Sequence, residues 1–118
     1  MSHNLFRQYV IPKISSKKST FFLLVDNLRL DQWKLISPLL SQYFQIEENT
    51  YCSILPTATQ YARNSIFSGM MPSAMKTKFP EFWLDDVDEG GKNLHEKDFL
   101  LSQLKHFGCS QDITFNKV

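Results

Sequence analysis

Residues 54–69 have the sequence ILPTATQYARNSIFSG, and this stretch decides the predicted fold. Pro56 ends an apolar segment, because proline has no amide to donate to a β-ladder. Thr57 and Thr59 follow, and threonine side chains are favoured at the start of a helix. Apolar residues then recur at helical spacing, and Gly69 stands where such a helix ends. The pattern predicts a buried strand, a tight turn and a helix. α/β proteins use this arrangement to place nucleophiles and to bind phosphate groups, although a capped turn without chemistry has the same pattern.

Length and composition limit the class of protein. A chain of 118 residues forms one domain at most, and 42% hydrophobic and 14% aromatic residues are typical of a globular protein. The 13 basic and 12 acidic residues form no basic stripe, which argues against a nucleic-acid surface. Cys52 and Cys109 are isolated, without the spacing of a metal site or a disulfide framework. We find no signal peptide and no apolar run near ~18 residues, so we expect a cytoplasmic protein without a membrane segment.

Two apolar runs predict neighbouring strands. Residues 20–25 read TFFLLV, which is typical of a strand buried on both faces, and residues 51–55 read YCSIL. Apolar residues at helical spacing lie between them over 30–44, with Pro38 expected to kink or divide that helix. The unit is therefore a right-handed βαβ crossover with parallel strands. The fold class that we expect is α/β, a partial and incomplete parallel-sheet α/β/α sandwich.

The remaining segments complete this expectation. Residues 1–18 are predicted to form a lead-in helix and linker, and residues 19–118 form the α/β domain. After Gly69 we expect a short helical turn, an aromatic flap that packs over the sheet and an acidic loop at 85–89. A helix over 96–107 and a short strand over 112–115 follow.

Asp26 and Thr59 are the candidate catalytic pair. Each follows a predicted parallel strand, so both are expected on the same rim of the sheet. A metal-activated alkoxide needs an acid that holds the metal and a hydroxyl next to it. Arg63 lies one helical turn after Thr59 and is a candidate contact for an anionic substrate. Two alternatives stay open: Asp26 as a cap or turn former, and Arg63 as the ion-pair partner of Asp31 or of the acidic loop.

Three blocks in order carry a family resemblance: VDNLRLDQW at 25–33, LPTATQYARN at 55–64 and EGGKNLHE at 89–96. Together they resemble the PglZ domain of the alkaline phosphatase superfamily, and more narrowly its PorX-type form, in which a response-regulator receiver precedes the domain. The resemblance implies two zinc ions at the rim of a central sheet. It implies Asp26 as a zinc ligand, Thr59 as nucleophile and zinc ligand, and Arg63 as a structural or substrate contact. The nucleophile of that superfamily stands about ten residues before a glycine, which selects Thr59 and leaves Thr57 as a cap.

The chain departs from the family in its metal ligands. A further Asp, an Asp-His pair and another His are expected later in the fold, and neither they nor a receiver domain are found in these 118 residues. We therefore expect the N-terminal part of a zinc-dependent phosphodiesterase or phosphatase-like domain from a two-component response regulator, inactive alone. Its substrate would be a phosphate ester or phosphodiester, and a sensor kinase and a receiver domain are its implied partners. The alternative is a non-catalytic α/β interaction module that docks a partner through the aromatic residues 79–83.

Overall fold

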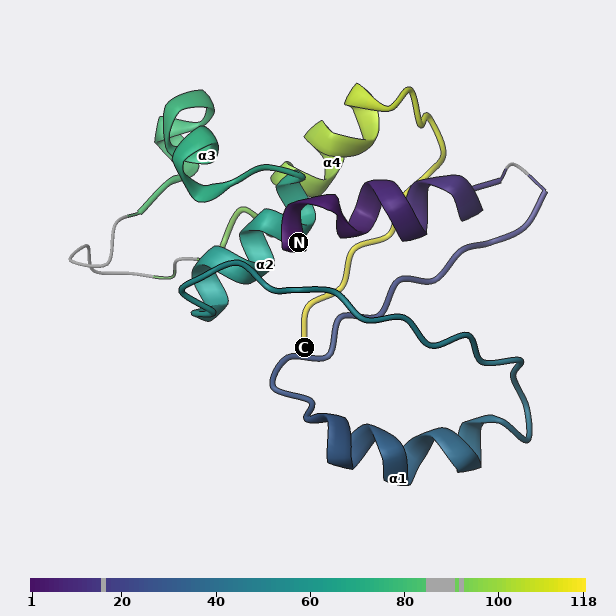
Figure 1. The fold of residues 1–118 in the computed structure, drawn as a ribbon. Helices are drawn as coiled ribbons and strands as arrows, with labels where there is room; N and C mark the ends of the chain where they lie inside the picture. Colours follow the sequence, from purple (N-terminus) through teal and green to yellow (C-terminus); the bar gives the residue numbers. More distant parts are fainter. Residues whose placement is uncertain (16, 85–90, 92) are drawn as a thin grey trace. The chain divides into compact units, whose positions relative to one another are not determined.

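The computed structural model describes residues 1–15, 17–84, 91 and 93–118, whose regular secondary structure is almost entirely helical (Figure 1). They divide into two compact units: a larger unit of Met1–Thr20 with Tyr51–Val118, and a smaller unit of Phe21–Thr50. In chain order the helices are η1 (Ser2–Asn4), η2 (Phe6–Val10), η3 (Ile11–Lys13), α1 (Leu30–Leu40), α2 (Thr59–Ser68), α3 (Pro72–Lys78), η4 (Pro80–Phe82) and α4 (Glu96–His106).

The predicted α/β sandwich is wrong for the described residues. They contain no β-sheet, and their only β-pairing is an isolated bridge between Ser15 and Lys18. Residues 20–25, 51–55 and 112–115, which were predicted as strands, have irregular backbone, so no parallel pair and no βαβ crossover form. The aromatic flap consequently has no sheet to cover.

Exposure of the apolar runs gives the physical reason. Phe21, Leu23 and Val25 are 86%, 84% and 61% exposed, whereas a central strand is buried on both faces. An apolar run forms a strand only when a neighbouring strand pairs with its backbone, and the runs 21–25 and 51–55 belong to different units. In the second run Ile54 is buried, but its amide donates to Ser2 Oγ at 3.1 Å instead of to a ladder.

The core of the larger unit forms between α2 and α4. Helix α2 contributes Ile66 and Phe67, and α4 contributes Phe99, Leu100 and Leu104, all of them buried. Both helices lie where the helical spacing of apolar residues predicts them, so the predictions of helices after Pro56 and from residue 96 are confirmed. The predicted short helical turn after Gly69 is α3.

The N-terminal segment packs on this core. The predicted lead-in helix over residues 1–18 is present as the three short helices η1, η2 and η3, with η2 in π geometry. Phe6 is 3% exposed, and Ser2 is fully buried, with its Oγ 3.3 Å from Ser53 Oγ. The boundary between lead-in and domain at residue 18 stays a prediction.

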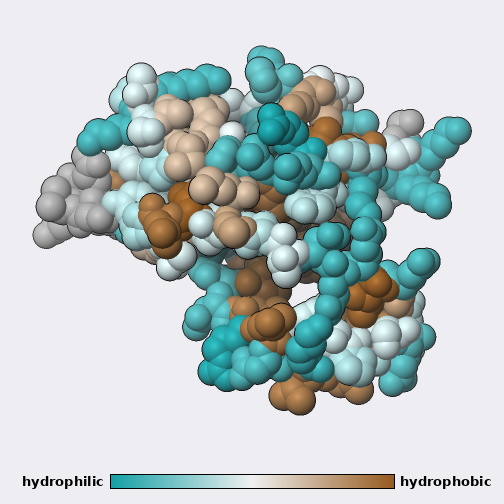
Figure 2. Space-filling model, in the orientation of Figure 1, coloured by the Kyte–Doolittle hydropathy of each residue, from teal (hydrophilic) through white to brown (hydrophobic). Residues whose placement is uncertain are grey.

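The smaller unit consists of α1 and its flanking segments. Pro38 lies inside α1, two residues before the helix ends at Leu40, and none of the helical residues is buried. Trp33 Nε1 donates to Glu48 Oε1 at 2.6 Å, and Lys34 Nζ donates to Glu48 Oε2 at 2.7 Å. The hydrogen bond from Lys34 and, to a smaller extent, the one from Trp33 hold the pKa of the Glu48 carboxyl below its usual value. Several apolar side chains of this unit are surface-exposed (Figure 2).

Candidate functional site

Thr59 is the first residue of α2 and is exposed. The helix is capped by Ala58, whose carbonyl accepts hydrogen bonds from the amides of Tyr61 and Ala62, each at 3.0 Å. No side-chain oxygen caps the helix, so the predicted cap role of Thr57 is wrong. The Thr59 hydroxyl therefore lies at the positive end of the helix dipole, a position that favours negative charge on a ligand.

Gly69 ends α2 as the sequence predicts. Its backbone is left-handed, with φ of 69°, and its amide donates to the Ser65 carbonyl at 3.0 Å. Glycine adopts this conformation without a steric penalty, which explains why the helix ends here. The predicted end of the helix that contains Thr59 is thus confirmed, whereas the strand predicted before it is absent.

Arg63 is ion-paired to Glu96 at the start of α4. Arg63 Nη2 donates to Glu96 Oε2 at 2.9 Å, and Arg63 Nε lies 2.7 Å from Glu96 Oε1. The second approach is an ion contact between the two charged groups. Lys117 adds a third contact, with Nζ 3.2 Å from Glu96 Oε2. A guanidinium one turn after Thr59 thus fastens α2 to α4.

Burial makes this pair unusual. The Glu96 side chain is 1% exposed and the Arg63 side chain 22%. A buried carboxylate is tolerated only when cations and hydrogen bonds compensate its lost hydration. Arg63 forms an ion pair, but with Glu96, which was not among the partners predicted for it. Asp31 pairs with Arg29 in the smaller unit, and the acidic loop at 85–89 lies outside the described residues. The role of Arg63 toward a substrate stays a prediction.

Aromatic rings surround the first turn of α4. His95 stacks on Phe82 with ring centroids 4.5 Å apart, and its Nδ1 lies 3.0 Å from Asp98 Oδ2. On the side of α2, Tyr61 stacks on Trp83 at 5.8 Å. The aromatic residues that were predicted to form a flap therefore pack against the helices next to the Arg63–Glu96 pair.

Asp26 lies in the smaller unit, in an exposed turn before α1. Asn27 follows with a left-handed φ of 58°. Asp26 does not cap α1, because the N-cap is Arg29, whose amide donates to Gln32 Oε1 at 3.0 Å. The open alternative of a turn position fits its place in the chain.

Asp26 and Thr59 belong to different units, and each is described within its own. The shared rim on which they were predicted to meet requires a sheet that the described residues do not form. Their pairing stays a prediction, now without the geometry that suggested it. Among the described residues, no group of three or more histidine, cysteine, aspartate or glutamate side chains is placed to hold a metal ion. One carboxylate and one hydroxyl are fewer than the three protein ligands of a catalytic zinc, so these two residues alone do not complete such a site.

The sequence block at 89–96 is described in part. Residues 85–90 and 92 lie outside the described residues, and so does the acidic loop at 85–89. The last residue of the block, Glu96, is the buried partner of Arg63, a role that sequence reasoning did not assign. One signal was available: Glu96 falls at helical spacing with the buried Phe99, Leu100 and Gln103, so it lies on the inner face of α4. A charge on such a face indicates a buried partner.

Comparison with known families gives one match. The family model described as "BREX system PglZ alkaline phosphatase-like domain" matches residues 5–117. A search of curated proteins gave no match. None of the helices in the described ranges has the length and hydrophobicity that crossing a bilayer requires.

Proposed function

The chain belongs to the PglZ family of alkaline phosphatase-like domains, and from this premise we propose that it supplies the nucleophile-bearing part of a zinc-dependent phosphoric ester hydrolase. In this proposal Thr59 is the nucleophile, and Asp26 and Thr59 are ligands of the metal. The observation that carries the proposal is the placement of Thr59. It is exposed, it is the first residue of α2, and the C-cap Gly69 follows ten positions later.

Arg63 has a positioning role in the proposal. Its guanidinium is already paired with the buried Glu96, so a substrate anion would share a charge that is partly neutralised. We propose that Arg63 fixes the orientation of α2, and thereby of Thr59, and that substrate contact is its second role.

The metal sets the limit of what this chain does by itself. When bound in a complete site, zinc supplies Lewis-acid stabilisation of phosphoryl oxygens and lowers the pKa of a bound hydroxyl. The donor set of Asp26 and Thr59 does not complete such a site. We therefore propose that the 118-residue chain has no measurable phosphodiesterase activity and binds zinc no more tightly than about micromolar.

The wider setting is also a proposal. The three sequence blocks resemble the PorX-type form, in which the domain belongs to a cytoplasmic two-component response regulator. On that resemblance we propose a receiver domain and a sensor kinase as partners, and a phosphodiester or phosphate ester as substrate.

Zinc titration with matched variants tests the site assignment. We expect weak zinc binding that falls at least about tenfold in Asp26→Asn and in Thr59→Val, because each removes one of the two proposed oxygen donors. Asp31→Asn is the control, since Asp31 lies near Asp26 in the chain and is engaged by Arg29. Equal losses in all three variants, or none in the first two, would contradict the ligand roles. Robust turnover of bis(p-nitrophenyl) phosphate by the purified chain with zinc would contradict the proposed inactivity.

The exposed apolar surface favours a second candidate, a non-catalytic interaction module. In the smaller unit Phe21 and Leu23 are each more than four-fifths exposed, and exposed apolar surface can mark protein contacts. Size-exclusion chromatography with light scattering separates the two candidates. A stable monomer without zinc-dependent change favours the interaction module.

A further inference from the structure

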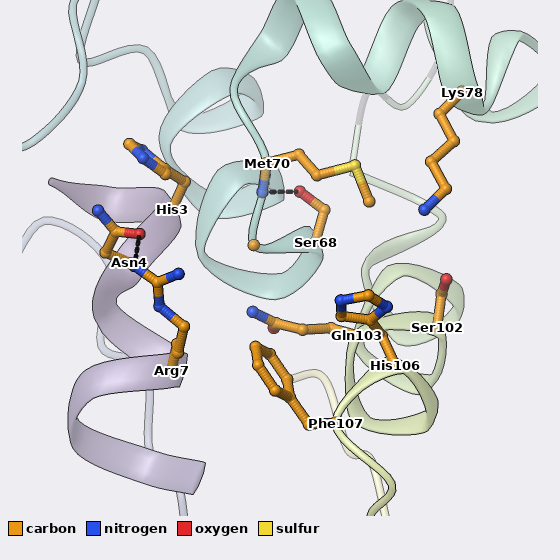
Figure 3. A pocket seen from close by; sticks show the side chains of 11 residues that line it. His3, Asn4, Arg7, Ser68, Met70, Lys78, Ser102, Gln103, His106 and Phe107 are labelled. Carbon is orange, nitrogen blue, oxygen red and sulfur yellow. Dashed lines mark hydrogen bonds between the residues drawn. The ribbon is translucent and has the colours of Figure 1, made fainter.

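A cavity of about 250 Å³ lies in the larger unit, at the end of α2 opposite Thr59. It is bounded by the N-terminal helices, the loop after α2, the end of α3 and the last turns of α4 (Figure 3). Ten helical residues separate the two ends of α2 by about 14 Å, so this cavity is distinct from the surroundings of Thr59. Its volume is just below the ~300–1,000 Å³ of pockets that hold drug-sized ligands, which suits a smaller molecule.

The described residues that line this cavity are basic or neutral. His3, Arg7, Lys78 and His106 line it, and none of the lining residues is an aspartate or a glutamate. The chain as a whole has 13 basic and 12 acidic residues, so this local excess of positive charge does not follow from composition. Arg7 and Lys78 are charged at neutral pH and give the cavity at least two positive charges.

Two buried polar atoms in the lining lack partners. Gln103 is 4% exposed, and its Oε1 makes no hydrogen bond; the buried His3 Nδ1 makes none either. Buried polar groups in native proteins are nearly always paired with protein, water or ligand atoms. Figure 3 shows the Gln103 side chain extending from α4 toward the N-terminal segment that contains His3 and Arg7. Gln103 Oε1 is thus available to a molecule in the cavity, whereas Figure 3 shows the His3 ring directed away from Gln103.

Helix ends give a competing account of the basic residues. Lys78 and His106 are in the last turns of α3 and α4, where the helix dipole favours cations. The dipole does not account for the cavity or for the unpartnered atoms of Gln103 and His3. The position of Arg7 has another cause than the helix dipole, because its Nη2 donates a hydrogen bond to Asn4 Oδ1 at 3.0 Å.

We propose that this cavity binds a small phosphate-bearing molecule. Arg7 binds the phosphate, because guanidinium groups bind phosphate in a bidentate way, and Lys78 adds a point charge from across the cavity (Figure 3). Gln103 Oε1 accepts a hydrogen bond from a hydroxyl of the same molecule. The site lies at the far end of α2, and the inference does not depend on the proposed role of Thr59.

Calorimetric titration of the 118-residue chain tests the inference. The probes are inorganic phosphate and glycerol 3-phosphate, at ionic strength held constant with chloride. We expect saturable binding, tighter for glycerol 3-phosphate because its hydroxyls reach Gln103, and at least about tenfold weaker binding in Arg7→Met and in Lys78→Met. Lys97→Met is the matched control, because Lys97 is exposed on α4 and does not line the cavity. It should leave the affinity within about twofold of the parent.

A second variant keeps the test sharp if charge removal perturbs the fold. Ser102→Phe places a ring in the cavity without changing charge, and it should abolish binding while the far-UV circular dichroism spectrum stays unchanged. The inference is overturned if neither probe binds below about 10 mM, or if Lys97→Met weakens binding as much as Arg7→Met. Binding of a hexaglutamate peptide in the absence of phosphate binding also overturns it, in favour of an acidic protein partner.

Discussion

Replacing Arg63 by methionine removes the main cation from a buried carboxylate. Glu96 is 1% exposed, and after the change Lys117 is the one cation of the described ranges still paired with it, at 3.2 Å and with a side chain that is 46% exposed. Breaking a buried ion pair on one side costs about 3–5 kcal/mol, because the other charge stays buried without compensation. Lys117 compensates part of this, so we expect a loss of about 3 kcal/mol.

A loss of this size is a large part of the stability of a small domain, which is typically about 5–15 kcal/mol. Urea unfolding, followed by circular dichroism at 222 nm, measures it directly. Thermal unfolding should show a melting temperature lower by about 10–20 °C. Methionine is chosen because it keeps the length and apolar volume of the arginine stem, so that packing against α4 changes little.

The double variant Arg63→Met with Glu96→Met distinguishes lost charge compensation from lost packing. Apolar replacement of a whole buried ion pair is often neutral or stabilising, so the double variant should recover to within about 1 kcal/mol of the parent. Lys97→Met, an exposed change on the same helix, should cost less than about 0.5 kcal/mol. The reasoning is refuted if Arg63→Met alone costs less than about 1 kcal/mol, or if the double variant is less stable than the single one.

Three further perturbations follow from the described contacts. Gly69→Ala should destabilise the larger unit by about 2 kcal/mol in urea unfolding, because the residue has a left-handed φ of 69° and a Cβ there meets a buried side-chain amide. Ser2→Ala should cost about 1–3 kcal/mol in the same assay, because it leaves a buried backbone amide without an acceptor. Acidification should alter Trp33 fluorescence. The hydrogen bonds from Lys34 and Trp33 lower the pKa of the Glu48 carboxyl in the folded chain below its usual value of 4.5. Their stabilising effect is therefore complete above pH 4.5 and is lost as the pH falls through the lowered pKa.

Each of these has a matched control. Gly108→Ala has a similar φ of 71° with no atom within 4 Å of the new Cβ, so it should cost only the backbone strain of about 1 kcal/mol. Equal costs at the two glycines would show that the buried amide does not matter. Ser53→Ala keeps the acceptor for Ile54 and should cost less than Ser2→Ala. The fluorescence is measured in Trp83→Phe, and an unchanged signal through the acid range would contradict the Glu48 contacts.

The helices of the larger unit could be predicted from the sequence because their signals are local. Helical spacing of apolar residues and a glycine at the end are sufficient to place α2, and the same holds for α4. The sheet was predicted wrongly for a different reason. Residues 21–25 have the composition of a central strand, but composition does not supply the neighbouring strand that pairs with them. Their exposed side chains show that burial was inferred from hydrophobicity alone.

The candidate site could be predicted only in part. Thr59 and its helix follow from the sequence, whereas the partner of Arg63 is 33 residues away and no local rule connects them. The helical spacing of Glu96 with buried residues was the available signal, but an acidic residue in the first turn of a helix is also favoured by the helix dipole, so its position alone did not indicate burial. Long-range ion pairs are set by tertiary packing, which a single sequence does not encode in any short pattern.

The 33-residue separation of Arg63 and Glu96 also determines when α2 can pair with α4 during synthesis. At about 5–20 residues per second, a ribosome takes about 2–7 seconds to add the residues from Arg63 to Glu96. During that interval Ile66 and Phe67 have no α4 to cover them, since their partners are still untranslated. A nascent chain at this stage presents the uncovered side chains of Ile66 and Phe67, and exposed apolar side chains are what a ribosome-associated chaperone binds.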